Sequence, residues 1–305
     1  MAVDVARAGS SLRGARLRLS AAFWRRPWTK AAALLAPPLA GFLLVYVGSL
    51  GVLFVSAFWT VDSFTGNVQH VWSLDNFRLI FSTSDPTYLR IAGRTVGIAA
   101  AVTATDAILA FPVGYFMARI ARPRTRTALF VLVLLPLWSS YLVRVYAWRL
   151  ILARDGALNW TLHGLGLPDA HIAYTNWAMW IVFSYVWLPF MVLPVYAALE
   201  RIPDSYLDAS GDLGAGGWRT FRSVVLPLAL PGVVAGSIFT FSLTLGDYVT
   251  PLLAGGASSQ FIGNVVYDSI GSQQIPFAAA FAAVPLAVMG VYLLIARKLG
   301  AFEAL

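Results

Sequence analysis

The chain has 305 residues, of which 59% are hydrophobic and 12% are charged, whereas soluble domains carry about 25% charged residues. A water-soluble core cannot absorb this much apolar sequence, so the composition predicts a polytopic membrane protein. The net charge is +8, and because the basic residues lie at the ends of apolar runs, the charge indicates membrane topology rather than nucleic-acid binding. The absence of cysteine excludes disulfides and thiolate chemistry. The three histidines lie apart in predicted loops, so no metal site is expected.

Six apolar stretches are long enough to cross a bilayer as helices, which takes roughly 20 residues. The predicted fold class is therefore all-α, a polytopic transmembrane helix bundle with about six spans. The third stretch is the least uniform because it carries Arg144 and Arg149. The first is far longer than a signal-peptide core of about 7–15 residues, so we expect a retained span. In chain order the stretches are 31–59, 92–118, 127–150, 176–199, 228–252 and 276–297.

The segments that connect these spans differ sharply in charge. Sixteen lysines and arginines lie on one face, in the N-terminal segment, the 119–126 and 200–222 loops and the C-terminal tail, against Arg78 and Arg154 on the other. Because basic loops stay inside, this asymmetry predicts cytoplasmic termini and a cytoplasmic 200–222 loop. We expect three regions: a basic tail attracted to anionic membrane lipid, a transmembrane domain and a short C-terminal tail, over 1–30, 31–297 and 298–305.

The cytoplasmic loop over about 200–226 contains a predicted short helix. Asp204 is placed to cap its first turn, and Gly214 is placed to end it in a left-handed conformation. Trp218 and Phe221, three residues apart, then share one helical face. Connections between bundled helices usually take about 2–8 residues, so a loop of this length needs a function. It is either an amphipathic linker on the membrane or a docking helix for another protein.

This loop resembles the cytoplasmic "EAA" loop of bacterial ABC importer permeases, whose pattern is Glu-Ala-Ala, three residues, Gly, and later Leu-Pro. In this sequence Asp replaces Glu, Ser replaces the second Ala, and Gly211 interrupts the helix. The resemblance implies that the helix docks in a groove of a separate ATPase subunit and transmits its closure to the spans. The residues that match the pattern are Asp208, Ala209, Ser210, Gly214, Leu226 and Pro227.

Three further segments resemble the spermidine/putrescine-type importer permeases: "LPLWSSYLVRVYAWRLIL" (135–152), "LGDYVTPLLAGG" (245–256) and "FIGNVV" (261–266). Permeases for iron, opines or other small solutes share parts of this pattern. The resemblance covers nearly the whole chain after residue 30. It implies a type I importer permease of the bacterial inner membrane, paired with a sister permease in a heterodimer. It also implies an extracytoplasmic substrate-binding protein and two ATPase subunits that use ATP and Mg.

The chain itself carries no nucleotide-binding motif. A P-loop needs Gly-Lys-Ser/Thr, and neither Lys30 nor Lys298 follows a glycine-rich turn. We therefore expect a transport subunit that is not an enzyme and binds no cofactor. A secondary transporter would usually show two related halves, and no internal repeat is clear. An intramembrane enzyme would need clustered catalytic groups, which the spans do not carry.

Asp247 lies within an apolar stretch, where a charge is expensive and usually faces a cavity or another charge. Gly246 and Pro251 loosen the helix around it, as suits a turn that lines a pore. A polyamine would require a carboxylate and aromatic faces for cation–π contact. The hypothesised path residues are Asp247, Tyr248, Trp138, Tyr141 and Arg144. The equally open alternative is a structural salt bridge between Asp247 and Arg144, in which Arg144 could itself gate the path.

Overall fold

The structure is a computed structural model that describes residues 27–62, 65–256 and 259–298. The chain divides into two compact units, one that ends at Ser56 and one that begins at Ala57. Nearly all of the two predicted tails lies outside the described residues. The first unit is a helical stretch that contains an apolar segment, Ala31–Ser56, long enough to span a membrane. Its elements are α2 (Pro27–Gly41), the π-helix η1 (Phe42–Val47) and α3 (Gly48–Ser56).

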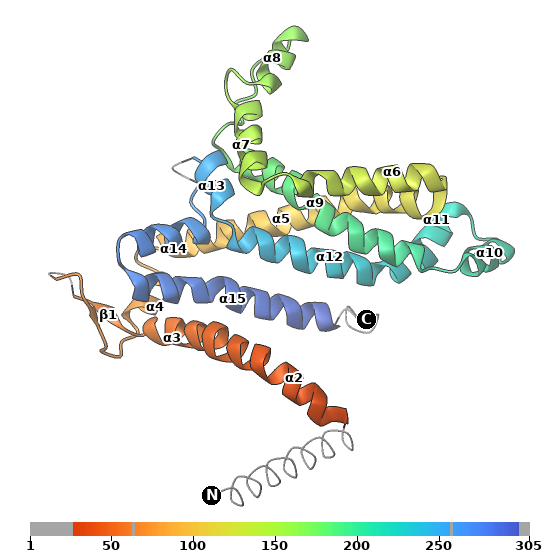
Figure 1. The fold of residues 1–305 in the computed structure, drawn as a ribbon. Coiled ribbons are helices and arrows are strands. Elements are labelled where there is room, and N and C mark those ends of the chain that lie inside the picture. Colours follow the sequence, from red (N-terminus) through yellow and green to blue (C-terminus); the bar gives the residue numbers. More distant parts are fainter. Residues whose placement is uncertain (1–26, 63–64, 257–258, 299–305) are drawn as a thin grey trace, which may run out of the picture. The chain divides into compact units, whose positions relative to one another are not determined.

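The second unit is almost entirely helical (Figure 1). A small sheet pairs β1 (Thr60–Val61) with β2 (Val68–Gln69) in antiparallel register. Its helices are α4 (Asp75–Ile80), α5 (Thr87–Tyr115), η2 (Phe116–Ile120), α6 (Pro123–Leu134), η3 (Leu135–Trp138), α7 (Tyr141–Leu152), α8 (Ala157–Gly164), α9 (Asn176–Glu200), α10 (Asp204–Asp212), α11 (Gly217–Thr220), η4 (Phe221–Val225), α12 (Leu226–Gly246), α13 (Val249–Ala254), α14 (Ile262–Gly271) and α15 (Ile275–Lys298).

Five helical stretches among the described residues are long and apolar enough to cross a membrane, or six if one bent pair counts as a span. This result confirms the predicted all-α bundle of about six spans. The third predicted stretch, 127–150, is not one straight helix, because Pro123–Trp138 and Tyr141–Gly164 meet at an angle of 93°. The backbone is extended at Ser139, and the 3₁₀ turn of η3 precedes it. The fifth stretch ends earlier than predicted, because α12 ends at Gly246.

Helices α5, α9 and α12 pack side by side and form the centre of the second unit (Figure 1). Glycine lets α12 approach α9 closely. A Cβ atom at Gly232 would overlap the Cβ of Ala198 and lie 2.6 Å from the Pro194 carbonyl oxygen, and one at Gly236 would lie 2.7 Å from the Met191 sulfur. Small residues four apart allow such close packing of membrane helices. The two ends of this bundle carry different features, with α13 and α14 at one end and α10 at the other (Figure 1).

Candidate functional site: the α10 loop and the helix breaks

The short cytoplasmic helix predicted from the sequence is α10. Gly214 has a φ of +75°, and the amide of Ala215 donates to the Ser210 carbonyl at 3.0 Å, which together form a left-handed helix end. The prediction for Gly214 is therefore confirmed. Two details were wrong. Pro203, rather than Asp204, occupies the N-cap position, because proline fixes the extended entry and leaves Asp204 inside the first turn. The helix also runs through Gly211 without interruption.

One side of α10 faces the segment that follows it. The hydroxyls of Ser210 and Thr220 lie 2.9 Å apart and join α10 to α11. A hollow of about 360 Å³ lies beside this contact, and Ala209, Ser210 and Leu213 are part of its lining. Asp208 is exposed on α10, and Leu213 has 87% of its surface exposed. The loop therefore presents both an acidic group and an apolar side chain to a partner.

The remaining matched residues, Leu226 and Pro227, begin α12 and are not part of the α10 surface. Between the two helices, the rings of Trp218 and Phe221 stack at 5.4 Å, which confirms their predicted common face. Phe221 also meets Phe111 of α5 edge-on at 5.4 Å. The aromatic pair thus links the loop to the bundle.

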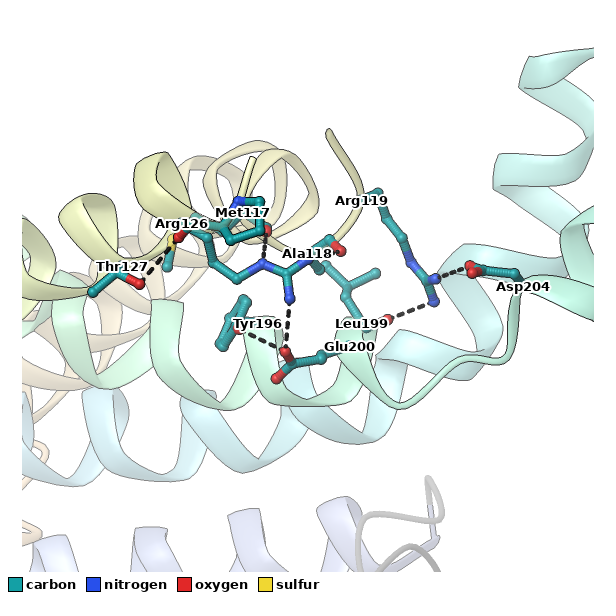
Figure 2. Close-up of polar contacts among 10 residues, drawn as sticks. Met117, Ala118, Arg119, Arg126, Thr127, Tyr196, Leu199, Glu200 and Asp204 are labelled. Atoms are coloured by element: carbon teal, nitrogen blue, oxygen red, sulfur yellow. Dashed lines mark hydrogen bonds and ion pairs between the residues drawn. The ribbon is translucent and has the colours of Figure 1, made fainter. Parts of the chain in front are cut away.

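Two arginines of the 119–126 segment reach the start of the α10 loop (Figure 2). Arg119, at the end of η2, donates to the carbonyl oxygen of Leu199 at 2.7 Å and to that of Ile202. Its guanidinium also pairs with Asp204 at 2.7 Å. Since the last carbonyls of a helix lack helical partners, Arg119 caps α9. Its side chain is only 12% exposed.

Arg126 makes a second set of contacts, from the first turn of α6 (Figure 2). It donates to the carbonyl oxygens of Met117 and Ala118 at 3.0 and 3.1 Å, which caps the end of η2. It also pairs with Glu200 at 3.2 Å. Glu200 in turn accepts a hydrogen bond of 2.8 Å from the hydroxyl of Tyr196. The end of α5, the start of α6 and the end of α9 are thus joined by polar contacts.

At the opposite end of the bundle, two helix breaks meet. Asp247 occupies the break between α12 and α13, and one of its oxygens accepts a hydrogen bond from the Val249 amide at 2.7 Å. Its other oxygen accepts hydrogen bonds from the Thr250 hydroxyl, at 2.9 Å, and from the hydroxyl of Tyr141. Because Tyr141 is the first residue of α7, this contact connects the break after η3 with the break after α12. Asp247 is buried.

Of the other hypothesised path residues, Arg144 lies beside this cluster, with its guanidinium carbon 5.9 Å from the centre of the Tyr141 ring. In the described part of the chain it forms no ion pair with Asp247, so the structure does not contain the salt bridge considered as an alternative. Tyr248 stacks on Tyr267 at 4.9 Å. Trp138 is 89% exposed on the surface of this chain.

The sequence did not reveal the roles of Arg119, Arg126, Glu200 and Thr250. In the sequence analysis the two arginines served only as evidence for membrane topology. The sequence did hold one signal. Arginines lie in the 119–126 loop and carboxylates at the start of the 200–222 loop, and the positive-inside rule places both loops on the same membrane face. The contacts span about 80 residues of chain, which no local pattern can encode.

Comparisons with known proteins agree with this architecture. Residues 110–300 match the family model of the binding-protein-dependent transport system inner membrane component. The chain is similar to the inner membrane ABC transporter permease protein YdcU of Escherichia coli K12, with 45% identity over 302 residues, 94% of this chain and 95% of that protein. It is also similar to the spermidine/putrescine transport system permease protein PotB of Salmonella typhimurium SL1344, with 31% identity over 84% of this chain and 89% of that protein.

A solved structure supports the fold. The structure of a bacterial ABC transporter involved in the import of the acidic polysaccharide alginate matches 92% of this chain and 99% of its own chain, with a TM-score of 0.73 and 17% identity. At this identity the likeness concerns the fold alone. The family model and the two relatives establish that the chain belongs to the binding-protein-dependent transport system inner membrane component family and is a permease subunit of an ABC importer.

Proposed function

We propose that the chain forms, with a sister permease, the membrane path of an importer for polyamines. Two separate ATPase subunits supply the energy from ATP and Mg, and an extracytoplasmic binding protein delivers the solute. The observation that carries the substrate assignment is the similarity to PotB, whose name describes spermidine and putrescine transport, over 84% of this chain. The chain itself supplies α10, the helix that docks on an ATPase subunit, and part of the solute path.

The surface of α10 supports docking on an ATPase subunit. Leu213, Tyr206 and Trp218 are exposed large apolar side chains on an otherwise polar loop. Apolar groups gathered on a polar surface mark contact sites for other proteins. The exposed Asp208 and the hollow beside Ala209 and Ser210 would give the partner a charge and a recess to fit.

The cluster of helix breaks supports a path for a cation. Asp247 supplies a carboxylate, and Tyr141 and Tyr248 supply aromatic rings beside a non-helical backbone. Irregular backbone within a membrane normally lines a cavity or is buried in protein, and a flexible polycation binds to carboxylates and ring faces. The exposed Trp138 would then face the sister permease or the solute across the path.

The test is uptake of radiolabelled spermidine and putrescine by cells that lack other polyamine systems. Loss of energised uptake on deletion of the gene, with restoration by the wild-type gene, is the expected result. Unchanged uptake would refute the polyamine assignment, and a panel of other small solutes, including opines and iron, would then be tested on the cognate binding protein.

A second measurement tests the source of energy separately. The affinity-tagged chain is expected to co-purify with an ATPase subunit and to support uptake that depends on ATP in proteoliposomes. Uptake driven by an ion gradient in the absence of ATP would instead indicate a secondary transporter.

A further inference from the structure

The four arginines of the 119–126 segment, which runs from η2 into the first turn of α6, fall into two kinds. Arg122 and Arg124 are exposed, and in the described part of the chain their side chains make no hydrogen bond or ion pair. Arg119 and Arg126 instead contact the end of α9 and the start of the 200–226 loop (Figure 2). All four arginines contribute the same charge to membrane topology, so topology does not explain why Arg119 and Arg126 make these contacts.

Arg119 contacts three consecutive parts of the chain with one guanidinium group. These are the last turn of α9 through Leu199, the linker through Ile202, and the first residue of α10 through Asp204. The Asp204 carboxylate is 85% exposed, and an ion pair with so exposed a partner contributes little. The buried guanidinium and its two carbonyl acceptors therefore carry most of the interaction.

Among the described residues, the other end of α10 has no charged attachment, and the segment after it meets α5 through the ring contact of Phe221 with Phe111. Beyond Gly214 the chain passes through Gly216 and Gly217, and a Cβ atom at any of these three glycines would meet nothing within 4 Å. The Ser210–Thr220 contact is a single neutral hydrogen bond. The charged attachment of α10 to the ends of α5 and α9 therefore lies at its first turn.

We propose that Arg119, supported by Arg126, is the positioning residue that joins α10 to the cytoplasmic ends of α5 and α9. When the ATPase moves α10, the spans α5 and α9 move with it as one rigid body. Without the guanidinium, the linker over 201–203 bends and absorbs the displacement. This inference rests on the proposed docking of α10 on an ATPase subunit.

The test compares Arg119→Gln with Arg124→Gln in the reconstituted complex of permease, ATPase and binding protein. Both variants remove one positive charge from the same turn, and only the first removes the contacts with α9 and α10. Arg119→Gln is expected to lower the amount of solute transported per ATP hydrolysed by about tenfold, within the usual range for coupling between linked sites. Its basal ATPase activity and its content of ATPase subunit are expected to match the wild type.

Equal transport per ATP in the two variants would overturn the proposal. A wild-type chain that binds no ATPase subunit would refute the proposed docking instead, and the two failures are therefore distinguishable. If Arg119→Gln does not assemble, a distance measurement on the chain with intact arginines decides the matter.

For that measurement, cysteines introduced at Thr125 and Ser205 carry spin labels. Both positions are exposed, and the chain has no cysteine of its own. The distance between the labels is expected to stay the same in the nucleotide-free and ATP-bound complexes, because α10 and the start of α6 move together. A distance that changes with nucleotide would show that α10 moves independently and would overturn the proposal.

Discussion

The hydroxyl of Tyr141 joins two broken helices, through Asp247 and Thr250. Tyr141→Phe removes this donor and keeps the stacking of the ring on Trp187 at 5.4 Å. Because a buried carboxylate then loses a partner, the free energy of unfolding should fall by about 1–3 kcal/mol. Thermal unfolding of the purified protein in detergent measures the change. Tyr248→Phe is the control, since the hydroxyl of Tyr248 makes no hydrogen bond in the described structure, and equal effects of the two would contradict the prediction.

The charge of Asp247 can be tested apart from its hydrogen bonds. Asp247→Asn keeps an acceptor oxygen for the Val249 amide and removes the negative charge that a polyamine would meet. If the path hypothesis holds, the KM for spermidine uptake should rise by about tenfold, which corresponds to roughly 1.4 kcal/mol of binding. Asp268→Asn, at an exposed carboxylate of α14, should leave the KM unchanged. An unaltered KM in Asp247→Asn would end the path hypothesis and leave Asp247 as a structural link between the two breaks.

At the scale of elements, the C-terminus of α10 depends on a left-handed residue. Gly214→Ala places a side chain at a φ of +75°, which costs an L-residue roughly 1–2 kcal/mol. We expect weaker co-purification of the ATPase subunit, because the last turn of α10 and Leu213 would lose their fixed geometry. Gly217→Ala is the matched control, since Gly217 begins α11 in open space with an ordinary φ. A normal complex with Gly214→Ala would show that this turn does not set the docking surface.

The α9–α12 contact makes a prediction for stability. Gly232→Ala would force the two backbones apart, and such overpacking typically costs about 1–3 kcal/mol. The loss should appear as a lower thermal unfolding temperature in detergent. Gly290→Ala in α15 is the control, because a Cβ atom there meets nothing within 4 Å and alanine favours the helix. A stability unchanged by Gly232→Ala would mean that α9 and α12 are not in close contact.

The sequence predicted elements better than it predicted their interruptions and contacts. Hydropathy identifies spans such as Asn176–Glu200 because length and apolar composition are local properties. Gly214 was predictable for the same reason, since one residue type dominates left-handed helix ends. The bend after Trp138 was not predictable from the sequence. Serine at 139 and 140 is compatible with a helix, and only tertiary packing selects the extended backbone. The contacts of Arg119 join residues far apart in the chain and follow from the fold alone.

At the scale of the whole molecule, two arguments must give the same orientation of the chain in the membrane. One is the excess of basic residues on one face, and the other is the proposed docking of α10 on an ATPase. The 119–126 segment carries four arginines, and the 153–175 segment that contains α8 carries Arg154 alone. The orientation that this asymmetry predicts places α8 on the extracytoplasmic side of the membrane and α10 on the cytoplasmic side, where an ATPase can reach it. Engagement of Arg119 and Arg126 in contacts does not weaken this asymmetry, because both side chains keep their charge on the same face.

Labelling of single cysteines tests this orientation in intact cells. A cysteine introduced at Thr161, exposed on α8, should react with a membrane-impermeant maleimide added from outside. A cysteine introduced at Thr125, exposed at the start of α6, should react only after the membrane is permeabilised, which also serves as the control for its reactivity. The opposite pattern would place α10 outside the cell, away from ATP. It would therefore contradict the predicted topology, the docking of α10 and the transmission of movement through Arg119 together, because all three require the 119–126 turn and α10 to share the cytoplasmic face.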